Sequence, residues 1–255
     1  MPVATALVWL RRDLRLKDNP ALAQAIADGF DPIPVYVHAP EEEGTWTSGS
    51  ASRAWLHHSL LSLSADIRKL GGRLILAKGT SLAELTRLMH TSNSTALYFG
   101  NLYEPALQTR DALVQAAFEN AGTPVRRFNA SLLFEPWQLR TGSGTPYRVF
   151  TPFWRNATAQ LRMRDAFADA ARFSEFMDPE APSIGDLRLL PSGRWHEGFW
   201  THWQPGEAGA MEMLEVFCDS AINGYKEQRN LPDRTGTSKL SPHLHFGEIS
   251  PHQIW

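Results

Sequence analysis

The sequence contains very little cysteine, because Cys218 is the single one among 255 residues. One thiol cannot form an internal disulfide, which excludes a disulfide-stapled secreted domain and favours a reducing, cytoplasmic environment. Long apolar runs are missing as well, and none approaches the roughly 20 residues that span a bilayer. At the N-terminus the charged residues follow the apolar run, which is the reverse of the order in a secretory signal. We therefore expect no association with a membrane.

An excess of charge of one sign is also missing. The formal net charge is -2, so the overall charge gives no nucleic-acid signal. No G-x-G-x-x-G follows the first predicted strand, where the sequence reads WLRRDLRLKDNPAL, and a standard dinucleotide fingerprint is excluded. The histidines at 243, 245 and 252 have no cysteine beside them and no spacing that makes ligands converge, so we expect no metal site.

What is present is ordinary globular composition, with 43% hydrophobic and 20% charged residues. Short β-rich runs alternate with helical patterns. Helix signals include Asn19 as an N-cap before Pro20, a capping box from Ser81 to Glu84, and a helix that begins at Pro105 and ends before Gly122. The strands are predicted at 5–10, 32–38, 73–77, 95–100 and 124–134. This order predicts an α/β fold with a doubly wound, five-stranded parallel sheet of Rossmann-like type.

The chain divides into three parts. Residues 1–134 form the α/β domain, which we expect to fold by itself. Residues 135–205 are rich in turns, Pro, Gly and Ser and are interpreted as an interdomain linker. Residues 206–255 are helical, the start of a second, all-α domain. We expect this last part to be poorly packed, because its helices lack partners that would cover their apolar faces.

Three features could carry chemistry, and each has a plainer explanation. The charged loop after the first strand, with Arg11 and Arg12, is either a ligand or domain-contact loop or a solvated basic loop. Glu104 lies between a predicted strand and a predicted helix. Its carboxylate is either stabilised by the dipole at the helix N-terminus or contacts a ligand at the carboxyl end of the strand. Tyr225 and Arg229 are four residues apart, so they either stack on a planar ligand and grip a phosphate or form a surface cation–π pair.

A fourth feature is the segment TGTSKLSPHLHFGEISP at residues 235–251. Hydroxyl groups crowd around Gly236 and Lys239 directly before a predicted helix; they belong to Thr235, Thr237, Ser238 and Ser241. Such a turn can hold a phosphate on backbone N–H groups, or it can be an ordinary capped loop.

Several segments taken together resemble the photolyase/cryptochrome family, with most similarity to bacterial class I cyclobutane pyrimidine dimer photolyases. They are WLRRDLRLKDNPAL, GSASRAWLHHSL, YEPALQTRD, VFTPFWR, WQPGEAGAMEMLEVF and YKEQRNLPDRTGTSKLSPHLHFGEISP, in the family's order. The last is long and specific, and the resemblance covers nearly the whole chain. Members of this family are substantially longer, so the chain is expected to be truncated at its C-terminus.

The resemblance implies a flavoprotein that repairs pyrimidine dimers in DNA with blue light, through an electron from reduced FAD. An antenna chromophore, a reduced folate or a deazaflavin, would occupy the N-terminal domain. By resemblance, Tyr225 contacts the flavin and Arg229 faces DNA. The residues that match the FAD phosphate loop are Thr237, Ser238, Lys239, Leu240 and Ser241.

The antenna residues would be Asn101 and Glu104, although Asn101 stands one position closer to Tyr103 than in many members, with Gly100 at the usual place. No catalytic residue is assigned within the chain. We expect a monomer that by itself retains little FAD and is inactive. The alternatives are a cryptochrome-type blue-light photoreceptor without repair activity and a generic nucleotide-binding α/β protein.

Overall fold

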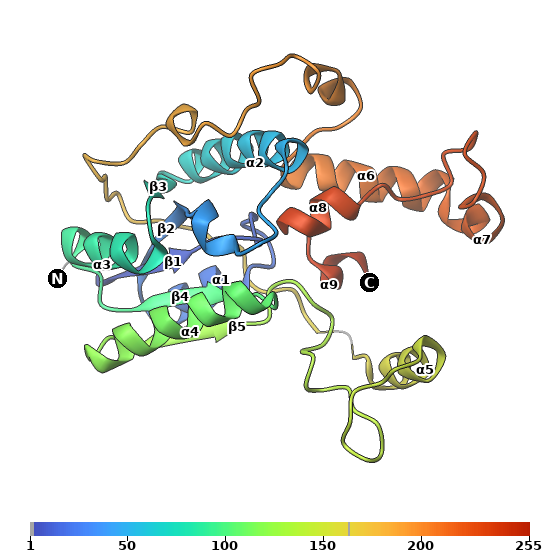
Figure 1. Cartoon of the computed structure of the whole chain (residues 1–255), viewed down its shortest axis with the longest axis horizontal. Helices are drawn as coiled ribbons and strands as arrows, with labels where there is room; N and C mark the ends of the chain where they lie inside the picture. The colour runs from blue at the N-terminus through green and yellow to red at the C-terminus, as the bar shows by residue number, and fades with distance from the viewer. Residues whose placement is uncertain (1–2, 163) are drawn as a thin grey trace.

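The computed structural model describes residues 3–162 and 164–255. At its centre lies a parallel sheet of five strands in the order β3-β2-β1-β4-β5 (Figure 1). The strands are β1 (Thr5–Trp9), β2 (Asp31–His38), β3 (Ile75–Lys78), β4 (Leu97–Gly100) and β5 (Val125–Phe128). The predicted fold class is confirmed, and the last strand is shorter than predicted because pairing with β4 stops at Phe128.

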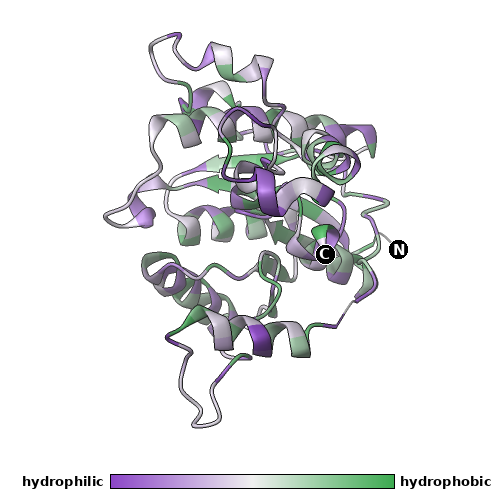
Figure 2. Cartoon of the chain, turned by 90° about the vertical axis from the view of Figure 1, so that its right-hand side faces the viewer, coloured by the Kyte–Doolittle hydropathy of each residue, from purple (hydrophilic) through white to green (hydrophobic). Residues whose placement is uncertain are grey.

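Helices cover both faces of the sheet. They are α1 (Pro20–Ala27), α2 (Ser50–Lys69), α3 (Ser81–Ser92) and α4 (Pro105–Asn120). Alternate strand residues pack to opposite sides: Val8 and its neighbours lie against α1 and α2, whereas Trp9 and its neighbours lie against α3 and α4. Figure 2 shows the hydrophobic colour concentrated on the strands between these helices. Both sides of a parallel sheet are thereby buried, as its apolar strands require.

The helix signals in the sequence have mixed outcomes. Asn19 caps α1 by accepting hydrogen bonds from the N–H groups of Ala21 and Leu22, as predicted. The capping box from Ser81 is wrong, because α3 begins at Ser81 itself. Glu42, from the 3-10 helix Pro40–Glu43, instead accepts hydrogen bonds from the N–H and hydroxyl of Ser81. A carboxylate from elsewhere in the fold thus takes the place that a local cap would have filled.

Residues 164–189, part of the predicted linker, contact the α/β domain through a few buried side chains, while most of the others are exposed. Phe173 is buried over Gly72, where a Cβ atom would lie 2.4 Å from the Cβ of Phe173. Leu187 and Leu189 join the same core cluster. The other part of the predicted linker holds α5 (Phe150–Gln160), which projects away from the sheet (Figure 1). Two further 3-10 helices, Gly185–Leu187 and Glu197–Thr201, complete this region.

The C-terminal helices lie beside the carboxyl ends of the strands. They are α6 (Glu207–Ser220), α7 (Tyr225–Gln228), α8 (Ser241–Phe246) and α9 (Pro251–Ile254), with the 3-10 helix Ile222–Gly224 before α7. The expectation that 206–255 is poorly packed is wrong for 246–250, whose residues are all buried. It holds better for 222–235, where nearly every residue is exposed. No helix among the described residues is both long and apolar enough to pass through a bilayer.

Candidate functional site

The loop at residues 10–19 lies at the carboxyl end of β1 and is largely buried. Arg11, Asp13 and Arg15 are only 6%, 3% and 1% exposed. Burial lowers the pKa of Arg11 to about 10, while the nearby carboxylate of Asp111, 3.1 Å away, opposes this change. The interpretation as a solvated basic loop is therefore wrong.

The same loop receives the C-terminal segment, which confirms its interpretation as a domain contact. The N–H of Leu14 donates to the carbonyl of Phe246 at 3.1 Å, and Arg15 donates to the carbonyl of Gly247 at 3.1 Å. Gly247 has φ of 66°, and a Cβ atom there would lie 2.0 Å from the carbonyl oxygen of Arg12. Glycine is thus required for both backbone conformation and space.

Aromatic and ionisable side chains complete this contact on α2. Trp55 stacks on Phe246 with ring centroids 6.2 Å apart and donates to Glu248 at 3.1 Å. The other carboxylate oxygen of Glu248 lies 2.5 Å from Nδ1 of His243, and both residues are fully buried. His243 is therefore a structural partner of Glu248.

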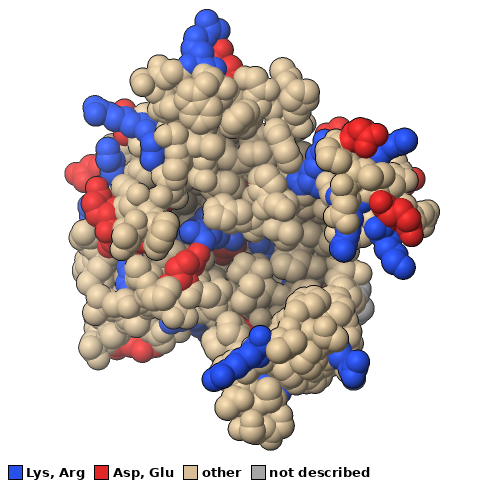
Figure 3. All heavy atoms as spheres, turned by 45° about the vertical axis from the view of Figure 1, so that its right-hand side comes forward, with Lys and Arg blue, Asp and Glu red and all other residues tan. Residues whose placement is uncertain are grey.

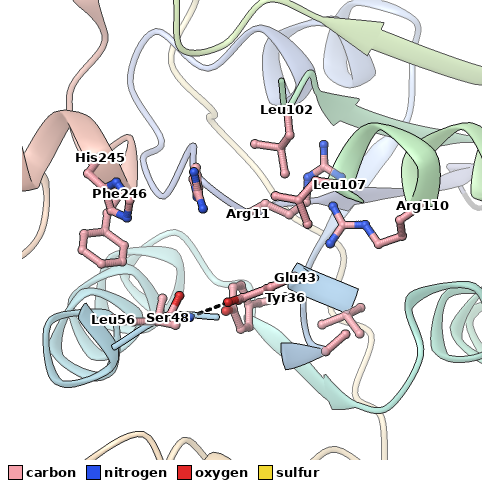
Figure 4. A pocket seen from close by; sticks show the side chains of 13 residues that line it. Arg11, Tyr36, Glu43, Ser48, Leu56, Leu102, Leu107, Arg110, His245 and Phe246 are labelled. Atoms are coloured by element: carbon pink, nitrogen blue, oxygen red, sulfur yellow. Dashed lines mark hydrogen bonds between the residues drawn. The ribbon is translucent and has the colours of Figure 1, made fainter. Parts of the chain in front are cut away.

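A pocket of about 60 Å³ opens at the carboxyl ends of β1 and β2 (Figure 4). Arg11, Arg12 and Arg110 bring positive charge to it, and Glu43, which accepts a hydrogen bond from the N–H of Ser48, brings a carboxylate. Burial, and then the charge of Glu43, raises the pKa of the Tyr36 hydroxyl, which stays protonated as a donor. The volume suits a small anionic group and not a whole chromophore.

A shallower hollow of about 430 Å³ adjoins this pocket, and the two share Arg12, Leu102 and His245. Basic and acidic side chains gather in a hollow at the centre of the face in Figure 3. Glu104 lines the larger hollow and binds Arg12. It is the N-cap residue of α4, where the helix dipole favours a carboxylate, although its side chain accepts no hydrogen bond from a helix N–H. Desolvation, and then the charge of Arg12, lowers the pKa of His245.

Asn101, the second predicted antenna residue, lies behind this hollow in a polar network. Its amide group donates to Glu135 at 2.8 Å, and its oxygen accepts from Arg127 at 2.9 Å. Tyr103 also donates to Glu135, at 2.9 Å. Both ends of the Asn101 side chain thus have protein partners, while Glu104 faces the hollow. The antenna role of each stays a prediction.

The predicted flavin residues lie apart from this hollow, on the segment from α7 to α8. The Arg229 guanidinium lies 5.6 Å from the Tyr225 ring, so the two form the cation–π pair that their spacing allows. Leu240 is buried against Ala210 and Ile249. This anchors the end of the predicted phosphate loop on α6.

The remaining loop residues keep their polar groups accessible. Thr237 and Ser241 are exposed, and Lys239 adopts a left-handed conformation with φ of 53°. A Cβ at Gly236 would lie 2.7 Å from the carbonyl oxygen of Gln228, so the loop turns tightly past α7. Exposed hydroxyls and an ammonium group on a tight turn fit the phosphates of FAD. The roles of these residues remain predictions.

Sequence reasoning did not find Tyr36, Arg110 or His245 as pocket residues. Tyr36 lies within an apolar strand pattern, so its sequence context predicts a place in the core. Arg110 lies within a helix pattern, so its context predicts a place on the surface. The rule that ligands bind at the carboxyl ends of parallel strands could have identified Tyr36, which lies two residues before the end of β2.

A family model described as DNA photolyase matches residues 6–173. The chain belongs to the DNA photolyase family. A deoxyribodipyrimidine photo-lyase of Agrobacterium fabrum is 39% identical over 258 residues, which cover 100% of this chain and 53% of that protein. Cryptochrome-1 of Arabidopsis thaliana is 33% identical over 268 residues, which cover 98% of this chain and 37% of that protein.

The fold of this DNA photolyase family chain also matches a crystal structure of a bacterial class III photolyase from Agrobacterium tumefaciens. The TM-score is 0.91 at 38% identity, over 100% of this chain and 53% of the other. The resemblance to the family is confirmed. The sequence motifs were most similar to class I photolyases, whereas this neighbour is a class III photolyase. The chain spans about half the length of the photo-lyases it matches.

Proposed function

We propose that the chain contributes the chromophore-bearing N-terminal part and the FAD phosphate loop of a light-driven enzyme that repairs cyclobutane pyrimidine dimers in DNA. The observation that carries this is the match of the whole chain to a photo-lyase at 39% identity. Support comes from the way the segment after Leu240 is fixed to the α/β domain through Gly247. That contact holds the phosphate loop in a set position relative to the antenna domain.

FAD, when bound, would supply the electron that opens the dimer. In this chain, Thr237, Ser238 and Ser241 would donate hydrogen bonds to its phosphates, and Lys239 would balance their charge. Leu240 holds the loop by its burial against Ala210 of α6 and Ile249. Tyr225 would contact the flavin, and Arg229 would face the DNA backbone. The protein is proposed to act as a monomer in the cytoplasm.

The antenna chromophore is proposed to lie over the shared hollow at the carboxyl ends of the strands. Glu104 would accept hydrogen bonds from a folate or deazaflavin ring, and the arginine-lined pocket would take an anionic group of the same molecule. The position follows from where ligands bind in parallel sheets. Asn101 would act through its network and hold Tyr103 in place.

Repair is tested on a complete chain, made by joining residues 1–255 to the part of the Agrobacterium fabrum photo-lyase beyond the match. We expect blue light to remove dimers from an irradiated oligonucleotide when the flavin is reduced, with no loss in the dark. Flavin binding without loss of dimers would refute repair and favour the cryptochrome-type photoreceptor. A Ser238→Ala, Ser241→Ala variant is expected to lose flavin, and a Ser143→Ala control to keep it.

The chain of residues 1–255 alone is expected to retain little flavin, because the phosphate loop by itself buries no large part of the ring system. The visible spectrum of the purified chain checks this. A flavin band in a ratio of one per chain would contradict it.

A further inference from the structure

The last part of the predicted linker, residues 191–205, forms a segment that lies over α2 at the top of Figure 1 and leads into α6. Within this fully described segment His196 is the single buried residue, while Trp200 and Trp203 are partly buried against the core. Among the residues that the structure describes, no hydrogen bond or ion pair joins the segment to another part of the chain. The segment therefore depends on the packing of its rings.

The surface that receives the segment carries two further imidazoles, on α2. The ring centroids of His57 and His58 lie 5.2 Å apart. The ring of Trp200 lies 4.1 Å from that of His58 and 6.3 Å from that of His196, so imidazoles from both sides of the contact surround it. We call His57, His58 and His196 the histidine cluster.

The packing of the histidine cluster favours neutral rings. Nδ1 of His57 and Nδ1 of His196 are buried without a hydrogen-bond partner among the described residues. A protonated imidazole donates from both nitrogens, so each of these rings would then leave a buried donor without an acceptor. Burial lowers the pKa of His57, with a smaller effect from His196, and it lowers the pKa of His58, with smaller effects from His57 and His196.

No carboxylate offsets positive charge in the histidine cluster. Among the described residues, none raises the pKa of His57 or His58. The charged and titratable groups on the packed elements bind elsewhere or face solvent; they are Arg194 with Glu197, His243 with Glu248, Arg53 with Ser48, and the exposed His202. A second proton in the cluster would therefore meet a like charge across the 5.2 Å between the rings of His57 and His58.

We infer that the histidine cluster is a pH-sensitive fastening: residues 191–205 stay docked on α2 while the imidazoles are neutral and separate from it when they gain protons. The docked state binds fewer protons than the separated one, so a fall in pH from 7.5 to 5.5 favours separation.

Separation would change the contact between the α/β domain and the helices that follow. It uncovers Trp55, whose ring lies 6.3 Å from that of Trp200 and 5.6 Å from that of Trp203. Trp55 also stacks on Phe246 and donates to Glu248, so its loosening reaches α8. Because the segment leads directly into α6, its release also frees the connection to that helix.

The test labels the chain of residues 1–255 with 5-fluorotryptophan and follows the ¹⁹F NMR signals of Trp55 and Trp200, each assigned by substitution with Phe. The shift of each signal between H₂O and D₂O measures how much of its ring meets solvent. We expect the fraction of chains with Trp55 exposed to rise at least about tenfold from pH 7.5 to pH 5.5. The rise should be steeper than the titration of one group, because several imidazoles gain protons together.

Two variants separate the histidine cluster from other titrating groups. His57→Gln, His58→Gln removes two of its three rings and keeps good helix formers on α2. In this variant the rise should shrink to less than about threefold. The matched control is His90→Gln, at an exposed position on α3, which should leave the rise unchanged.

Trp9, which is fully buried in the sheet, separates release of the segment from unfolding, since its signal should not change. The inference is overturned if Trp55 stays shielded at pH 5.5, if the double variant behaves as the parent chain does, or if Trp9 becomes exposed together with Trp55. The same transition is expected in the complete chain of the repair assay, and its absence there would overturn the inference too. Because no light or flavin is used, failure here is distinct from failure of repair.

Discussion

Gly247 offers the sharpest test of the contact between the C-terminal segment and the α/β domain. The substitution Gly247→Ala places a Cβ atom 2.0 Å from the carbonyl oxygen of Arg12 and 2.6 Å from the Cα of Asp13. Both contacts are to backbone atoms, which cannot move aside as a flexible side chain can. The segment must therefore shift or separate from the loop.

The expected cost follows from three contributions. The left-handed conformation costs an alanine about 1–2 kcal/mol. A shift also weakens the hydrogen bond from Leu14 to Phe246 and the charged one from Arg15 to Gly247, which contribute roughly 1 and 1.5 kcal/mol or more. The total is about 4 kcal/mol, a large share of the usual 5–15 kcal/mol stability of a domain.

Gly122→Ala is the matched control, because Gly122 has φ of 79° and no atom lies within 4 Å of its Cβ position. It should show only the conformational cost. Urea unfolding gives both free energies, and amide exchange at residues 243–250 together with Trp55 fluorescence reports local separation. If Gly247→Ala costs no more than Gly122→Ala, then the close approach of α8 to the loop does not exist in solution.

Two other predictions concern titration and a buried carboxylate. Desolvation, as the main cause, lowers the pKa of five histidines, which are His38, His57, His58, His245 and His252. The unfolded chain then binds more protons than the folded one near pH 6, so the free energy of unfolding should fall from pH 7 to pH 5; urea midpoints independent of pH would contradict this. Burial raises the pKa of Asp18, but hydrogen bonds from Arg164 and Ser250 outweigh it and keep the pKa below its ordinary value. Asp18→Asn should therefore cost about 2 kcal/mol at pH 7 in urea unfolding and progressively less as the pH falls below 4, and an equal cost at both pH values would contradict this origin.

The sequence alone determined the order of the strands and helices, because apolar periodicity, Asn19 before Pro20 and the glycines that follow α1, α2 and α4 are local signals. It also determined the family, because the motif at 225–251 is long and specific. The predicted capping box at Ser81 was wrong because a distant carboxylate binds there in place of a local one. Glu42 reaches Ser81 from 39 residues away, and no short-range pattern could reveal that contact.

Only the tertiary structure decided which charged residues are buried. Arg11 and Arg15 belong to a sequence that looks like a solvated loop, yet they are enclosed once α8 and β4 pack against them. Tyr36, Arg110 and His245 meet in one pocket although they lie on a strand and two different helices far apart in the chain. Their meeting depends on crossover connections that bring the carboxyl ends of parallel strands to one edge. A sequence pattern fixes which face of an element is apolar, whereas the partners that cover it follow from packing.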